Sequence, residues 1–229
     1  IGVGNCSSLT ANYTVTATVT TGTAGQITEE LNVDDGSGET GLAGNGAFFI
    51  NRLTPSRYPS RLQRVRIYIA QFTNAPDPSG AQIRLIAFNT PRNNEPPASP
   101  SYLLDRTVII PTITSARYVD FDVPEAPSIS EGDWFIGFQM PNPSGGVACV
   151  FDGTSTAQGR SYFKALTGTS YQNATGLNAM IRGVVLSGTP LVCNYALAPT
   201  SQTFTASGGT GTVNVTVNNG CAWTATSNA

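Results

Sequence analysis

The sequence predicts an all-β, antiparallel protein, with a jelly-roll or β-sandwich over residues 26–187. A separate segment, residues 1–25, precedes it, and residues 188–229 begin a second, smaller sandwich. Three observations favour this fold class. Apolar and polar residues alternate with a period of two in many segments, turn residues recur every 10 to 20 positions, and no helix-period segment exceeds about two turns.

The first expected strand is residues 12–20. Tyr13, Val15, Ala17 and Val19 form one face, and threonines form the other. The acidic, glycine-rich residues 27–46 that follow are expected to form a short strand and a loop. Further strands are expected over 47–53, 63–72, 83–88, 102–110, 117–123, 134–140 and 180–186.

A domain boundary is expected near residues 187–190. Beyond it, Val213, Val215 and Val217 alternate with polar residues after a glycine-rich turn. About forty residues supply about three short strands, and a chain of that length is marginal as an independent sandwich.

The composition excludes several function classes. The chain has no His, which removes Ser-His-Asp and Cys-His catalysis and most zinc sites. Its formal net charge is −2 and only 11% of residues are charged, so no basic surface for nucleic acid is expected. No apolar run is long enough to span a membrane. No local signature supports paired catalytic carboxylates, and we expect no enzyme activity.

The cysteines and the polar surface favour an extracellular or bacterial cell-surface location. Cys6, Cys149, Cys193 and Cys221 are widely spaced, without a C-x-x-C pair, so disulfides are favoured over a metal-thiolate site. The favoured pairing is Cys193 with Cys221, which leaves Cys6 with Cys149 by elimination. Four cysteines allow three connectivities, and the sequence does not decide between them.

The C-terminal residues resemble the opening of a BACON domain, an immunoglobulin-like β-sandwich of secreted bacterial proteins. The matching features are Cys193, Tyr195, Pro199, Ser201, Phe204, the turn at 207–211, the strand at 213–217 and the segment Gly220 to Ala225. The resemblance covers about the first half of the module, over residues 190–229. It implies a partial immunoglobulin-like sandwich and a carbohydrate-binding role whose residues would lie partly in the other half.

Residues 31–186 are similar to a jelly-roll module of secreted bacterial multidomain proteins, which often carry subtilisin-like peptidases. The similar segments are VDDGSGE, INRLTPSRYP, EGDWFIGF, GRSYF and AMIRGVV. This resemblance implies a scaffold and brings no catalytic role.

An acidic loop is a weak candidate for a Ca²⁺ site. Asp34, Asp35 and Glu39 offer oxygen ligands at short spacing around glycines, as a hard cation requires. The spacing lacks the full EF-hand pattern, and a solvated acidic loop is the simpler interpretation.

Aromatic residues could form a platform on which a sugar stacks. Tyr68, on an arginine-bearing strand face, is the best exposed candidate, whereas Trp134 and Trp223 are expected in the core. The nearby Arg64 and Arg66 are expected to pair across strands with acids such as Asp120 and Asp122.

Two functions remain open from the sequence. In the first, the protein is a subunit of a surface fibre, assembled head to tail with like subunits when the strand at 12–20 completes the unfinished second sandwich of a neighbour. In the second, it is a carbohydrate- or cell-surface-binding accessory region, joined to other domains of a longer secreted protein such as a peptidase. Both are non-catalytic.

Overall fold

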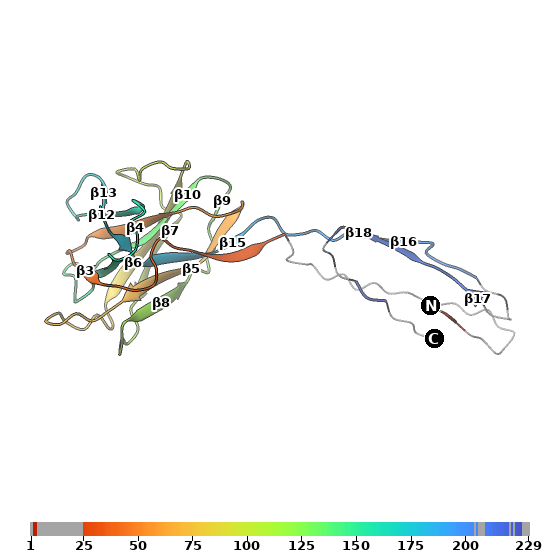
Figure 1. The fold of residues 1–229 in the computed structure, drawn as a ribbon, viewed down its shortest axis with the longest axis horizontal. Coiled ribbons are helices and arrows are strands. Elements are labelled where there is room, and N and C mark those ends of the chain that lie inside the picture. Colours follow the sequence, from red (N-terminus) through yellow and green to blue (C-terminus); the bar gives the residue numbers. More distant parts are fainter. Residues whose placement is uncertain are drawn as a thin grey trace. The chain divides into compact units, whose positions relative to one another are not determined.

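The computed structural model describes residues 2–3, 25–203, 205, 209–219, 221 and 223–225. These residues form β-strands joined by turns and loops (Figure 1). No helix among them could cross a membrane. The chain divides into two compact units. The central unit is Thr28–Gly188, and the other combines Ile1–Ile27 with Thr189–Ala229.

The larger sheet of the central unit has six strands in the order β13-β12-β4-β10-β6-β7. Its pairings are antiparallel. Its strands are β4 (Phe48–Leu53), β6 (Gln82–Thr90), β7 (Leu104–Ile109), β10 (Asp133–Gln139), β12 (Ser161–Lys164) and β13 (Gln172–Asn173).

The second sheet has five strands, in the order β2-β15-β5-β8 with β9 also paired to β5. A three-stranded sheet, β14-β11-β3, accompanies them. The strands of these two sheets are β2 (Ile27–Leu31), β3 (Thr40–Leu42), β5 (Ser60–Ile69), β8 (Arg117–Asp122), β9 (Ser128–Ile129), β11 (Cys149–Asp152), β14 (Asn178–Ala179) and β15 (Ile181–Ser187).

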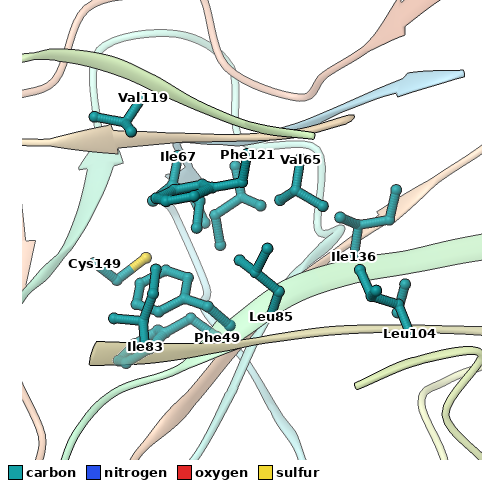
Figure 2. Packing of buried hydrophobic residues seen from close by; sticks show 14 of the residues in the cluster. Phe49, Val65, Ile67, Ile83, Leu85, Leu104, Val119, Phe121, Ile136 and Cys149 are labelled. Carbon is teal, nitrogen blue, oxygen red and sulfur yellow. The ribbon is translucent and has the colours of Figure 1, made fainter. Parts of the chain in front are cut away.

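The core of the central unit lies between the two larger sheets. Figure 2 shows Phe49, Leu85 and Ile136 of the six-stranded sheet facing Val65 and Phe121 of the five-stranded sheet. In β5 buried residues largely alternate with more exposed ones, whereas β10 is buried on both faces. The apolar residues that the sequence pattern assigns to the core therefore lie in the core. The all-β sandwich is therefore confirmed.

Trp134 belongs to this core. Its side chain is fully buried, and its indole Nε1 donates a hydrogen bond to Ser60 Oγ at 3.1 Å. Trp134 lies in β10 and Ser60 in β5, so this bond joins the two sheets and satisfies a buried donor.

A second apolar cluster lies on the opposite face of the six-stranded sheet. Phe88 and Phe135 stack there with ring centroids 5.0 Å apart, and Tyr171 is 8% exposed. Strands β4, β6 and β10 are thus apolar on both faces, which explains their continuous apolar runs.

Strands β16 (Tyr195–Ala198) and β18 (Asn214–Val217) pair in antiparallel orientation within the other unit. Residues of β1 (Gly2–Val3) pair with β17 (Gly209–Thr210). The expected donor strand, residues 12–20, lies outside the described residues. Trp223, expected in the core, is 47% exposed.

The cysteines differ in part from the expected pairing. Cys193 and Cys221 form a disulfide, with Cα atoms 5.8 Å apart. Cys149 is a free thiol in the core of the central unit, so the pairing with Cys6 is not present (Figure 2). Burial raises the pKa of the Cys149 thiol, because the thiolate would lose its hydration. Cys6 itself lies outside the described residues.

Candidate binding site

The expected calcium ligands are bound by donors of the chain itself. The Asp34 side chain is fully buried, and its Oδ1 lies 2.5 Å from Arg182 Nη2 and accepts the Tyr118 hydroxyl at 2.6 Å. Asp35 Oδ1 accepts the backbone N–H of Ser37, and Glu39 Oε2 accepts that of Gly153. Among the described residues, no three His, Cys, Asp or Glu side chains form a group that could hold a metal ion.

Arg182 contacts both acidic partners and the aromatic ring of this cluster. It also pairs with Glu30 at 2.6 Å, and its guanidinium lies 4.3 Å from the centroid of the Tyr118 ring. Burial alone would lower the pKa of Arg182, because it disfavours the charged guanidinium. The hydrogen bonds to Asp34 and Glu30 outweigh burial, so the pKa of Arg182 is raised. Burial raises the pKa of Tyr118, and the hydrogen bond to Asp34 raises it further.

The arginine-bearing face continues as a ladder of ion pairs. Arg64 pairs with Asp122 at 2.9 Å and with Asp120 at 3.2 Å, and Arg66 pairs with Asp120 at 2.7 Å. These strands, β5 and β8, are neighbours with Arg64 opposite Asp122. The predicted cross-strand pairing is confirmed, and this face is occupied by its own salt bridges.

Tyr68 lies on the same face and is half-buried. Its ring meets Tyr118 edge to face, with centroids 5.2 Å apart. Part of its ring surface is therefore in contact with Tyr118, and a sugar-stacking role of Tyr68 stays a prediction.

A hollow at one end of the sandwich is the strongest candidate for a binding site. It has a volume of about 600 Å³, which lies in the range of small-molecule pockets. Three loops enclose it: those between β3 and β4, between β5 and β6, and between β10 and β11. Its lining includes Phe72, Asn74, Pro143, Ser144, Gly41 and Gly146.

Close contacts fix the shape of this pocket. The ring of Phe72 lies against Gly41, where an added Cβ would be 2.2 Å from Cζ. Gly146, with φ +85°, lies against the carbonyl of Pro76, to which a Cβ would approach within 2.1 Å. A side chain at Gly41 would displace the Phe72 ring, and one at Gly146 would meet the Pro76 backbone, so the two glycines allow these segments to pack closely.

Hydrogen bonds hold the polar side of the pocket. Ala75 N donates to Phe72 O at 3.1 Å, which forms a turn that includes Asn74 at φ 68°. Ser144 N donates to Asn45 Oδ1 at 3.0 Å, and Val147 N donates to Ser144 O at 3.0 Å. Asn74 is exposed and Ser144 half-buried, and both line the same hollow as Phe72.

The side chains of the pocket's lining limit the chemistry that it could support. Its lining is mainly apolar, with Phe72 among alanines and prolines; Asn74 and Ser144 are its polar side chains, and none of the lining residues is titratable. An apolar ring face covers the C–H face of a sugar, and amide and hydroxyl groups bind sugar hydroxyls. General acid–base catalysis needs a titratable group in reach, and the lining offers none.

The comparisons with known proteins support the fold. No family model matches the sequence, and no curated protein matches it. The BACON resemblance of residues 190–229 therefore stays a prediction. The similar solved structures include two of the clostridial protein Cwp84, each at 14% identity.

The first is the crystal structure of the cysteine protease and lectin-like domains of Cwp84, a surface layer associated protein. Its TM-score is 0.55, over 70% of this chain and 36% of that one. The second is a variant of this clostridial cysteine protease after propeptide cleavage, with a TM-score of 0.53 over 72% of this chain and 41% of that one. This chain thus spans well under half the length of either, and what they share is the fold.

Sequence reasoning did not find the pocket. The sequence places Phe72 at the end of an expected strand, and no pattern around Asn74 or Ser144 indicates a binding role. The three loops that meet here are far apart in the sequence and have no periodic pattern. The one available signal was the density of glycine and proline around residues 141–146, which marks tight turns without saying what they enclose.

Proposed function

We propose that this chain is a non-catalytic, carbohydrate-binding accessory region of a larger secreted or cell-surface protein. The loop-end pocket beside Phe72 holds the sugar. The observation that carries the proposal is the pocket's lining, which combines the Phe72 ring with Asn74 and Ser144 among alanines, prolines and glycines and contains no titratable side chain.

The lining also indicates the class of sugar. Acidic sugars are bound through arginine or lysine, and neither lines this pocket. A neutral sugar needs no counter-charge, and its hydroxyls can bond to Asn74, Ser144 and the exposed backbone of the glycine turns. We therefore assign the pocket to neutral sugars.

The structural similarities agree with this assignment. The matched chains carry a cysteine protease and, in the first, a lectin-like domain, and the matched part is about a third of that chain. Because the described residues here are all-β, we infer that the lectin-like domain is the part that matches. A disulfide and a polar surface with a single lysine suit an extracellular location.

A glycan array with the full chain tests the proposal, followed by titration calorimetry on the best neutral sugar. Phe72→Ala should weaken binding at least about tenfold, because the stacking surface is lost. Tyr68→Ala is the matched control, since it removes an aromatic ring outside the pocket, and it should bind as the unchanged protein does.

Two results would contradict the proposal. If no glycan on the array is bound, the chain is not a carbohydrate-binding region. If Phe72→Ala binds normally while Tyr68→Ala does not, the sugar lies on the arginine-bearing face and the pocket assignment is wrong.

A further inference from the structure

The outer face of the six-stranded sheet, opposite the main core, carries a group of cationic residues. Tyr162 of β12 belongs to the second apolar cluster, and Arg160 and Lys164, two positions to either side, share its face. Arg52 N donates to Arg160 O at 2.8 Å, which continues the pairing of β4 with β12 and places these two arginines opposite each other. Like charges opposite each other on neighbouring strands destabilise a sheet, so a bound anion would stabilise this one.

The chain supplies little counter-charge to this face. Among the described residues, no carboxylate lies within ion-pair distance of Arg160 or Lys164. Arg160 Nη2 donates to the hydroxyl of Thr54 at 2.9 Å. Lys164 Nζ lies 4.8 Å and 4.9 Å from the ring centroids of Phe48 and Tyr171. Both cations are half-buried, and their described contacts are with neutral groups.

A proline-rich segment contacts two of these cations. We call it the strap, residues 91–101, between β6 and β7. Arg52 Nη1 donates to Asn93 O at 3.2 Å. Lys164 Nζ donates to Ala98 O at 3.3 Å. The strap is mostly exposed and contains four prolines, which have no N–H, so it offers acceptors to the cations and few donors.

The strap also contributes one carboxylate. Glu95 lies 3.8 Å from Arg52 Nη1 and accepts the Tyr162 hydroxyl at 3.2 Å, although its side chain is 73% exposed. Exposed ion pairs contribute little, so a carboxylate of a bound molecule could replace that of Glu95.

Two buried polar atoms on the same face have no hydrogen-bond partner. They are Arg52 Nε and the Tyr171 hydroxyl, and no other buried side-chain nitrogen or oxygen of the described residues lacks one. The Tyr102 hydroxyl is close to that of Tyr171 without satisfying it. Unsatisfied buried groups cost stability, so finding both on one face indicates that this face has a binding role.

We propose that this cationic face, formed by Arg52, Arg160 and Lys164, binds an acidic oligosaccharide whose carboxylates displace the strap. The face offers mainly donors and positive charge, which suits a molecule rich in anionic oxygens. A peptide brings an N–H donor with nearly every carbonyl, and the face has few acceptors for these donors. The half-buried ring of Tyr102 provides a surface on which a sugar can stack. This face shares no residue with the neutral-sugar pocket.

Titration calorimetry on the full chain with an oligogalacturonide tests the proposal, with its methyl ester as the uncharged control. The ester should bind at least about tenfold more weakly than the acid, because the charge-assisted hydrogen bonds are lost. Lys164→Gln should weaken binding of the acid by a similar factor. Arg117→Gln, the matched control, removes one positive charge from β8 of the other sheet and should leave the affinity unchanged.

Glu95→Gln gives a result that misfolding cannot produce. It removes the carboxylate that competes for Arg52, so the oligogalacturonide should bind about two- to fivefold more tightly. Glu125→Gln removes an acid that pairs with Arg106 and should leave the affinity unchanged. Each variant is checked for an unchanged circular dichroism spectrum.

Four results would overturn the proposal. They are no binding of the oligogalacturonide, equal binding of its methyl ester, an affinity that neither Lys164→Gln nor Glu95→Gln changes, and equally tight binding of a glutamate-rich peptide. Phe72→Ala should leave binding of the acid unchanged, and a loss would place the acid in the loop-end pocket instead. The two proposals can therefore fail independently.

Discussion

Arg182 lies over the Tyr118 ring and binds the fully buried carboxylate of Asp34. Replacing it with methionine would leave that carboxylate buried without its counter-charge, which costs about 3 kcal/mol. We expect Arg182→Met to lower the free energy of unfolding by about this amount in urea titrations followed by tryptophan fluorescence.

Arg64 provides the control for this prediction. It belongs to the same ladder, but its side chain is 41% exposed, so Arg64→Met should cost at most about 1 kcal/mol. Adding Asp34→Asn to Arg182→Met should recover part of the loss, since the buried charge is then gone. Equal effects of Arg182→Met and Arg64→Met would show that burial of Asp34 does not matter.

Residue roles were predictable from the sequence where partners lie on adjacent strands. Arg64 and Asp122 each follow a period-two pattern, and opposite charges on neighbouring strands pair. The partner of Asp34, a weak calcium candidate from the acidic loop, could not be predicted in this way. Arg182 is 148 positions away, and only the sheet order β2-β15-β5 brings it close.

At the scale of elements, the turn after β11 is built around one carboxylate. Asp152 accepts the backbone N–H groups of Thr154, Ser155 and Asp35 at 2.9 to 3.1 Å, as well as the Ser155 hydroxyl. Burial alone would raise its pKa, but these donors outweigh burial and lower the pKa to about 2.

The stability contributed by Asp152 should therefore depend on pH. A carboxyl whose folded pKa is lowered stabilises the fold above its unfolded pKa, near 3.9, and loses that contribution as pH falls toward 2. Urea unfolding should show the unchanged protein more stable than Asp152→Asn at pH 6. The gap should shrink by about 2 kcal/mol near pH 2. A gap that does not change with pH would contradict this assignment.

Elements with a repeating pattern were predictable, and loops were not. The strand expected over 117–123 is β8, Arg117–Asp122, because alternation marks both its face and its length. The pocket beside Phe72 depends on how three loops meet, and glycine contacts such as Gly146 with Pro76 exist only in the folded chain. Loop sequences carry no period from which such contacts could be inferred.

At the scale of the whole molecule, the two compact units differ in what stabilises them. The central unit, Thr28–Gly188, has a core between two large sheets, with Phe49, Leu85 and Trp134 nearly or fully buried. The other unit has two-stranded sheets and the Cys193–Cys221 disulfide. Two-stranded sheets are marginal in water, so the covalent link matters more there.

Removing the disulfide should therefore affect one unit only. The bridge spans 28 residues, and closing a loop of that length contributes about 3.5 kcal/mol through the entropy of the unfolded chain. In the double variant Cys193→Ser, Cys221→Ser, amides of β16 and β18 should exchange with deuterium faster, while amides of β10 keep their protection. Peptide-resolved hydrogen exchange measures both in one sample. Equal loss of protection in β10 would mean that the two units fold as one and that the central core depends on the bridge.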